Sequence, residues 1–453
     1  MKLGRKATAM ALSAATLFSL VVPVSAATKN DGKSLSITKE LQMPEGVTTP
    51  NTDFTFDFTA TGYKSNQGDN LDATIKGPAI NSQTIHFDKK MTGSVDNETK
   101  YVVKDTNDIL PEFSTANLTK PGYYFYTVKE KTGTYDYTKD TSVTTENYTA
   151  HMQYSLAEYD VVFTVVKGTD GNLKVDSSTV TTKKDDAGNE IPKKKIDGTV
   201  NPDKSDTGKK EDEKGNKYGN EFRFINKFNR KNGSDKTDPT NPQPGKDPKD
   251  AGLWLGKYVT GALGDTTKYF DFTVKVTNPK LKTDAVKDTY KAYIVKNTGT
   301  KAAPTYVSVT KDEAKIVSTD AQLDATKNLY YVELTSGAAK SVKLKDNFAM
   351  AAYEVATGSK FEMSESNPGD GYSTTLELFV NGQMIAGKTL ASSEQLLGDQ
   401  GKNTAFFTNT KENTPFTGLF INNLPFIIMA LVAVSAFGLV LLTNVKKARR
   451  SEN

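Results

Sequence analysis

Apolar and polar residues alternate along much of the chain with a period of two. The alternation is clearest at Phe54, Phe56 and Phe58, and it recurs in the segments 159–165 and 270–276. Successive side chains of a β-strand point to opposite faces, so this pattern predicts strands with one buried face. Turn-forming Gly, Asn, Asp and Pro residues bound the segments, and no long amphipathic helix is expected between them. We therefore predict an all-β protein built of β-sandwiches.

The order of these segments is repeated in two parts of the chain. The opening segments, SLSITKEL (34–41) and GLWLGKYVTG (252–261), are each followed by a Phe-rich alternating segment. Each part closes on a segment that combines Phe with Asn, EFRFINKF (221–228) and AFFTNTK (405–411). The repeated order indicates an internal duplication.

A polar segment separates the two parts. Residues 229–250 contain four Pro and no large apolar side chain, which is typical of an extended, solvated linker. We therefore predict one β-sandwich domain at 27–229, a linker at 230–250 and a second β-sandwich domain at 251–413. A further polar stretch, at about 168–220, is predicted to form long loops within the first domain.

The N-terminal residues 1–26 have the pattern of a secretory signal peptide. Basic residues precede an apolar run from Ala11 to Val24, and Val24-Ser25-Ala26 supplies a small-residue cleavage site. The alternative is an uncleaved membrane anchor, for which the apolar run is short. The pattern predicts that the mature protein is secreted.

The C-terminal residues 414–453 consist of three consecutive segments. A short motif, Thr414-Pro415-Phe416-Thr417-Gly418, is followed by 19 uncharged residues from Leu424 to Leu442 and then by a basic tail. The uncharged segment is about long enough to cross a bilayer as a helix, and the basic tail would keep the C-terminus cytoplasmic. An ordinary C-terminal membrane anchor is one interpretation of this end.

The three segments together resemble the cell-wall sorting signal of Gram-positive surface proteins. In that family a Leu-Pro-any-Thr-Gly motif precedes the apolar span, and Thr414 stands here where Leu is usual. The resemblance implies that a sortase cuts between Thr417 and Gly418 and joins the Thr417 carbonyl to an amine. The departure at Thr414 leaves the sortase class open. The resemblance to the sorting signal further implies that the protein is anchored to peptidoglycan after a membrane-bound precursor stage.

Removing both ends changes the charge of the chain. The 453 residues carry 58 Lys+Arg and 54 Asp+Glu, a formal net charge of +4. Residues 1–26 and 418–453 carry +3 each, which leaves −2 for residues 27–417. The remaining charges of both signs are interspersed, which argues against a nucleic-acid-binding surface.

The composition also excludes several kinds of site. The chain has no Cys and two His, so disulfides, thiol nucleophiles and Cys-based metal sites are absent. A His-rich metal site or a Ser-His-Asp triad is not expected, and no cofactor is predicted.

One Lys, one Glu and one Asn in each part fall on the predicted inward face of a strand. Alternate residues share a face, so the parity of the apolar neighbours assigns each polar residue. Lys39 follows Leu35 and Ile37 on one face, and Lys257 follows Leu253 and Leu255. The same argument selects the remaining four inward residues: Glu130, Glu365, Asn226 and Asn409.

Buried charged residues need a compensating interaction or a function. A desolvated lysine loses its proton and becomes a nucleophilic amine, while a buried Glu tends to stay protonated. We expect the amine to attack the Asn side-chain carbonyl, polarised by the Glu, so that ammonia leaves and a Lys–Asn isopeptide bond forms. The alternatives are a buried Lys–Glu ion pair with a hydrogen-bonded Asn, or edge strands from which the Lys extends into solvent. The recurrence of the triplet in the same order favours the covalent interpretation.

The chain resembles the streptococcal major-pilin family. The resemblance rests on SITKEL, PNTDFTFDF, PGYYFYTVKEK and FIN in the first part and on the ordered Lys257, Glu365 and Asn409 in the second. It implies Ig-like β-sandwich domains stacked end to end, with bonds Lys39–Asn226 and Lys257–Asn409 promoted by Glu130 and Glu365.

The resemblance also implies a function and a set of partners. The chain would be a pilus shaft subunit, linked covalently to other copies of itself by a sortase and attached to peptidoglycan. A lysine must then accept the Thr417 acyl group, and Lys217 or Lys214 lies nearest to the position expected in the family. The alternative function is a monomeric wall-anchored adhesin or stalk that binds host surface ligands. A secreted hydrolase is disfavoured, since the inward Glu residues occur one per domain and not as a carboxylate pair.

Overall fold

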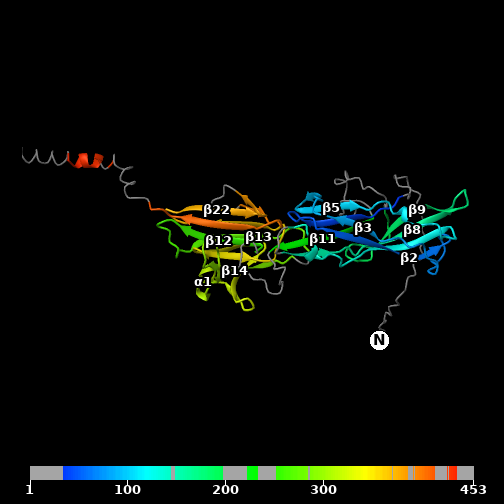
Figure 1. Cartoon of the computed structure of the whole chain (residues 1–453), viewed down its shortest axis with the longest axis horizontal. Coiled ribbons are helices and arrows are strands. Elements are labelled where there is room, and N and C mark those ends of the chain that lie inside the picture. The colour runs from blue at the N-terminus through cyan, green and yellow to red at the C-terminus, as the bar shows by residue number, and fades with distance from the viewer. Residues whose placement is uncertain are drawn as a thin grey trace, which may run out of the picture.

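The computed structural model describes residues 34–143, 148–196, 222–232, 251–283, 286–369, 371–385, 391, 393–413, 426 and 428–435. Strands dominate these ranges, which confirms the predicted all-β class. The strands form two groups, here called the N-terminal half (residues 34–232) and the C-terminal half (residues 251–413). Figure 1 shows the halves end to end along the long axis of the molecule.

The N-terminal half is built from two facing sheets. Its elements are β1 (Thr38–Pro44), β2 (Thr52–Lys64), β3 (Gln83–Phe87), β4 (Ser94–Asp96), β5 (Thr99–Asp105), the 3-10 helix η1 (Leu110–Glu112), β6 (Gly122–Glu130), the 3-10 helix η2 (Tyr137–Lys139), β7 (Tyr148–Gln153), β8 (Glu158–Lys167), β9 (Leu173–Lys184), β10 (Lys195–Ile196) and β11 (Arg223–Asn232). One sheet includes the order β11-β1-β5-β4 with β7 also paired to β11, and the other has the order β10-β9-β8-β6-β2-β3. Their apolar faces enclose one buried cluster that includes Leu35, Phe54 and Phe163.

In its described residues, the C-terminal half also has two facing sheets, of nine and four strands. Its elements are β12 (Leu253–Thr260), β13 (Phe270–Thr277), β14 (Thr289–Asn297), β15 (Tyr306–Ser308), α1 (Lys311–Val317), β16 (Gln322–Asp324), β17 (Leu329–Thr335), β18 (Ala339–Leu344), β19 (Phe348–Ala352), β20 (Val355–Ala356), β21 (Lys360–Glu365), β22 (Ser373–Val380), β23 (Gln383–Ile385), β24 (Gln395–Leu396) and β25 (Thr404–Thr410). The larger sheet has the order β16-β17-β14-β19-β12-β25-β22-β23, with β15 on β14, and the smaller has β18-β13-β21-β24. A buried apolar cluster that includes Leu255, Phe272 and Phe407 lies between them.

The first and last strands of each half are parallel neighbours. β1 pairs with β11, and β12 pairs with β25. Among the described residues, the other strand pairs of these two sheets are antiparallel. Each parallel pair joins two segments that are distant along the chain. This pairing brings the opening and closing segments of each half side by side.

Two predictions about polar segments need correction. Residues 173–184 were expected to lie in loops, but they form the strand β9, in which Val180 is buried. Frequent Thr and Val residues favour a strand there, and its many polar side chains do not prevent pairing with β8. The closing strand β11 also continues through Asn232, beyond residue 229, and residues 233–250 of the predicted linker lie outside the described residues.

The extension of β11 contacts the C-terminal half. Lys231 and Asn232 pair with Ala356 and Val355 of β20, so one sheet contains strands from both halves. Arg230 lies beside this pairing and is fully buried.

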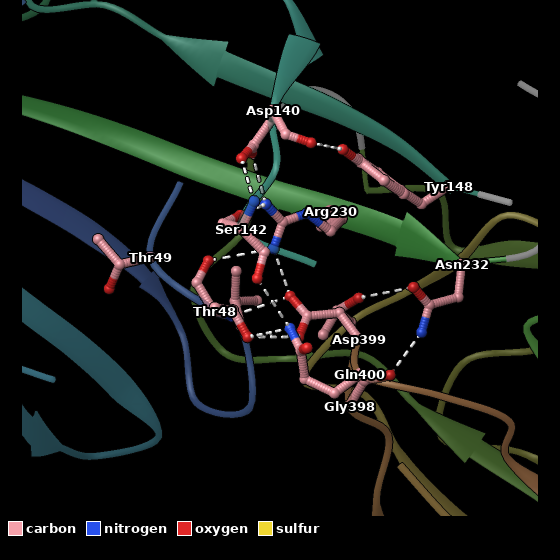
Figure 2. Close-up of polar contacts among 12 residues, drawn as sticks. Thr48, Thr49, Asp140, Ser142, Tyr148, Arg230, Asn232, Gly398, Asp399 and Gln400 are labelled. Carbon is pink, nitrogen blue, oxygen red and sulfur yellow. Dashed lines mark hydrogen bonds and ion pairs between the residues drawn. The ribbon is translucent and has the colours of Figure 1, made fainter. Parts of the chain in front are cut away.

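Arg230 joins carboxylates from both halves, as Figure 2 shows. Its guanidinium donates to Asp140 at 2.9 Å and also to Asp399 of the C-terminal half. The same group donates to the Thr48 carbonyl at 3.1 Å and to Ser142 Oγ at 3.0 Å. The halves therefore meet through a buried ionic cluster, here called the junction cluster (Thr48, Asp140, Ser142, Arg230 and Asp399).

Candidate functional site

Lys39, Glu130 and Asn226 meet in the core of the N-terminal half. Lys39 Nζ lies 2.7 Å from Glu130 Oε2, and Asn226 Nδ2 donates to Glu130 Oε1 at 2.7 Å. Lys39 and Asn226 are fully buried, and Glu130 is 6% exposed. One carboxylate therefore bridges the amine and the amide, away from solvent.

Strand register explains why these three side chains converge. In the parallel pair β1–β11, Lys39 is aligned with Phe224, and Leu41 is aligned with Asn226. Lys39 and Asn226 are thus diagonal neighbours on the same face of one sheet. Glu130 is the last residue of β6 in the facing sheet, so its side chain closes the triplet from across the core.

Lys257, Glu365 and Asn409 form the equivalent triplet in the C-terminal half. Lys257 Nζ lies 2.8 Å from Glu365 Oε1, and Asn409 Nδ2 donates to the same oxygen at 2.6 Å. All three residues are buried. Glu365 Oε2 is buried without a hydrogen bond from any described residue, which disfavours the ionised carboxylate.

The two triplets share the same register. Lys257 is aligned with Phe407 in the parallel pair β12–β25, and Asn409 is two residues farther along. Each acid is also aligned with a core Phe, because Glu130 pairs with Phe56 and Glu365 with Phe272. Two separate parts of the chain therefore build one arrangement, as an internal duplication predicts.

Burial shifts the proton affinities of the triplets toward the neutral forms. Burial lowers the pKa of Lys39 and of Lys257 to about 8 in each case, although the neighbouring Glu opposes that shift. Burial also raises the pKa of Glu130 and of Glu365, against the opposing effect of the paired lysine. A neutral amine beside a protonated acid is thereby brought closer in free energy to the ion pair.

Aromatic rings cover each lysine. Lys39 Nζ lies 4.7 Å from the centre of the Phe54 ring, and Lys257 Nζ lies 4.4 Å from that of Phe270. Such rings stabilise an ammonium ion by a cation–π contact and exclude water from a neutral amine.

The contact between Glu and Asn differs from the expected one. We expected each Glu to polarise the Asn carbonyl, but Glu130 and Glu365 face the amide nitrogen. The carbonyl oxygen of Asn226 accepts from the Ser155 backbone N–H, and that of Asn409 accepts from Thr374 Oγ1. A backbone N–H can only donate, so it requires an oxygen opposite it, and this fixes the orientation of the Asn226 amide.

A second, partly buried carboxylate lies near each lysine, and the sequence did not identify either one. Asp186 accepts from Ser155 Oγ at 2.5 Å and from the Ile225 N–H at 2.9 Å. Asp346 accepts from the Val259 N–H at 2.7 Å. Burial raises the pKa of both acids, and each interacts electrostatically with its lysine. Neither residue lies in an alternating strand segment, so parity offered no signal for them.

The other predicted functional residues cannot be placed. Lys217, Lys214 and the motif residues 414–418 lie outside the described residues, as does the predicted signal peptide 1–26. Within the predicted apolar span, residues 428–435 are helical. Among the described residues, no helix has both the length and the apolar character needed to span a membrane. Nor do they contain a group of three or more His, Asp or Glu side chains suited to a metal ion.

Comparison with known proteins finds similar solved structures only. No protein-family model and no curated protein matches the chain. The major pilin from Streptococcus pyogenes is 19% identical, over 84% of this chain and 99% of that chain, with a TM-score of 0.28. The major pilin T3.2 from Streptococcus pyogenes is 16% identical, over 83% of this chain and 98% of that chain, with a TM-score of 0.29. A pilus-presented adhesin is 19% identical, over 43% of this chain and 31% of that chain, with a TM-score of 0.17.

Proposed function

We propose that this chain is a pilus shaft subunit, anchored to the cell wall and stabilised by self-formed Lys–Asn isopeptide bonds. The observation that carries the proposal is the pair of buried Lys–Glu–Asn triplets, one per half, each between a first and a last strand. The order of motif, apolar span and basic tail at the C-terminus supports attachment by a sortase at Thr417.

The bond-forming step follows from the contacts of the carboxyl group. Proton transfer from the lysine ammonium to the Glu carboxylate gives a neutral amine and a neutral acid. The amine nitrogen then attacks Cγ of the Asn, and the carbonyl oxygen takes the negative charge. The acid protonates the amide nitrogen, recovers a proton from the attacking nitrogen, and the Cγ–Nδ2 bond breaks to release ammonia. Formation of each bond thus releases one ammonia and leaves the Glu protonated. The reaction occurs once per site, so the protein is not an enzyme.

The mechanical consequence explains why a shaft subunit would use such a bond. Force applied at the two ends of a half acts on its first and last strands, which are parallel neighbours. Without a cross-link, that force separates a ladder of hydrogen bonds. With a Lys39–Asn226 or Lys257–Asn409 bond, the force acts on a covalent path.

Mass measurement tests the cross-links directly. The mature chain should weigh two ammonias less than its sequence, and Glu130→Ala or Glu365→Ala should each restore one. Glu362→Ala is a matched control, since Glu362 is exposed on the same strand as Glu365 and should restore none. A mature chain with the full sequence mass would refute the isopeptide proposal.

Wall extracts on denaturing gels test the shaft function separately. Covalent polymers should give a ladder of high-mass bands, which Thr417→Ala should abolish. If Lys217 accepts the acyl group, Lys217→Arg should also remove the ladder, while Lys214→Arg should retain it. A single wall-linked band from the wild type would instead identify a monomeric adhesin or stalk.

A further inference from the structure

The two bond-forming sites differ in the group that contacts the Asn carbonyl oxygen. At the N-terminal site that group is the Ser155 backbone N–H, 2.7 Å from Asn226 Oδ1. At the C-terminal site it is the Thr374 side-chain hydroxyl, 2.7 Å from Asn409 Oδ1. The sites also differ in that Lys39 and Asn226 contact different oxygens of Glu130, whereas Lys257 and Asn409 share one oxygen of Glu365. The donor to the Asn carbonyl is the difference that a single substitution can test.

The Ser155 amide is held in place by its own side chain. Ser155 is buried in the connection between β7 and β8, and its Oγ donates to Asp186 at 2.5 Å. Asp186 also accepts the N–H of Ile225, the residue directly before Asn226. The donor and the amide that it contacts are therefore tied to the same carboxylate.

Thr374 is held by strand pairing. It lies in β22, directly opposite Asn409 in the antiparallel pair β22–β25. Directly opposed side chains of antiparallel strands are close enough to interact, so this position places a hydroxyl at the carbonyl. Thr375, the next residue, is exposed on the other face of the strand.

Both donors lie where charge develops during bond formation. Attack of the amine on Cγ transfers negative charge to the Asn carbonyl oxygen. A hydrogen-bond donor already aimed at that oxygen, in a site closed to water, stabilises the transition state more than the ground state.

We propose that the Ser155 N–H and the Thr374 hydroxyl are the oxyanion donors of the two isopeptide-forming sites. The inference rests on the proposed bond formation. It adds that the C-terminal bond depends on a hydroxyl that mutation can remove, whereas the N-terminal bond depends on the backbone.

The test compares the two bonds within one molecule. The full chain is produced in a Gram-positive host without sortase, and the cross-linked peptides β1–β11 and β12–β25 are quantified by mass spectrometry after a short synthesis pulse. Thr374→Val, which removes the hydroxyl but keeps the side-chain shape, should slow the β12–β25 bond by roughly 100-fold, the typical effect of losing one oxyanion donor. The β1–β11 bond in the same chains should form at the wild-type rate.

Three further variants separate the hydroxyl from general effects on folding. Thr374→Ser keeps the hydroxyl and should restore most of the rate, while Thr375→Val should have no effect on either bond. Ser155→Ala keeps the N–H but loses the Oγ contact with Asp186, so it should slow the β1–β11 bond less than Thr374→Val slows the β12–β25 bond. Formation of the β12–β25 bond at the wild-type rate in Thr374→Val would overturn the inference. Absence of both cross-links from the wild-type chain would instead refute the proposed bond formation.

Discussion

Replacement of Arg230 by Met should destabilise the contact between the two halves. Arg230 is fully buried, and so are the carboxyl groups of its partners Asp140 and Asp399. Breaking a buried ion pair by removing one partner typically costs about 3–5 kcal/mol, because the other charge remains buried. Met keeps much of the apolar contact of the arginine stem, so the lost charge dominates the effect.

The remaining hydrogen bonds set the magnitude. Without Arg230, Asp140 keeps the Tyr135 hydroxyl and the backbone N–H groups of Asn51 and Ser142. Asp399 keeps the N–H and the hydroxyl of Thr48. Neither carboxylate is left bare, so we expect a loss near the lower end of the range, about 3 kcal/mol.

Denaturant unfolding of the full chain measures this loss. Trp254 is the one tryptophan and is buried in the C-terminal half, so its fluorescence reports the unfolding of that half. Lys360→Met is the matched control, because Lys360 also links the halves, through a partly exposed pair with Glu98. Such a pair contributes less than about 1 kcal/mol. An Arg230→Met effect no larger than that of Lys360→Met would refute the reasoning.

The same variant predicts a pH dependence. Burial raises the pKa of Asp140, but Arg230 and the Ser142 donors outweigh it, and the resulting pKa lies below the usual value. A carboxyl group with a lowered pKa in the folded state stabilises the protein above its unfolded pKa, and this contribution is lost as the pH falls. The difference in stability between the wild type and Arg230→Met should therefore be constant near neutral pH and decrease below about pH 4.

Three other measurements test the rest of the account. Lys39→Met or Lys257→Met should each lower the free energy of unfolding by about 5 kcal/mol, which is the loop-closure value for a link between residues 187 (226 − 39) or 152 (409 − 257) positions apart. A loss below about 1 kcal/mol would contradict a covalent link. The rate of bond formation at the Lys39 site should be highest at a pH between the raised pKa of Glu130 and the lysine pKa of about 8, because only there do the amine and the carboxylate share the one proton that the reaction needs. A rate that still rises above about pH 9 would argue against a role for the acid. Gly358→Ala should lower the melting temperature more than Gly337→Ala, because both glycines have positive φ but only a Cβ at Gly358 would meet the N-terminal half, 2.5 Å from a Pro44 carbon. Equal shifts in melting temperature would show that backbone conformation alone matters.

The sequence determined the strand class and the inward residues of the two triplets. A period of two assigns each side chain to a face, so the parity of apolar neighbours placed Lys39, Glu130 and Asn226 on buried faces without any knowledge of the fold. The same local signal failed for β9, whose solvent-facing residues are polar and resemble a loop.

Only the tertiary structure decided which faces meet and which atoms touch. Periodicity carries no information about strand partners, so it could not give the parallel pairing of β1 with β11. Nor could it give the register, in which Asn226 lies two residues beyond the partner of Lys39. The same holds for the Ser155 N–H and Asp186, which reach the site from connections between strands. Arg230 is the clearest case. In the sequence it follows the predicted closing segment 221–228 and begins the predicted linker, so its context predicts a solvated residue. In the structure it lies within β11, and partners 90 and 169 positions away bury it between the halves. A charged residue is buried only when distant parts of the chain supply its partners, and folding alone brings them together.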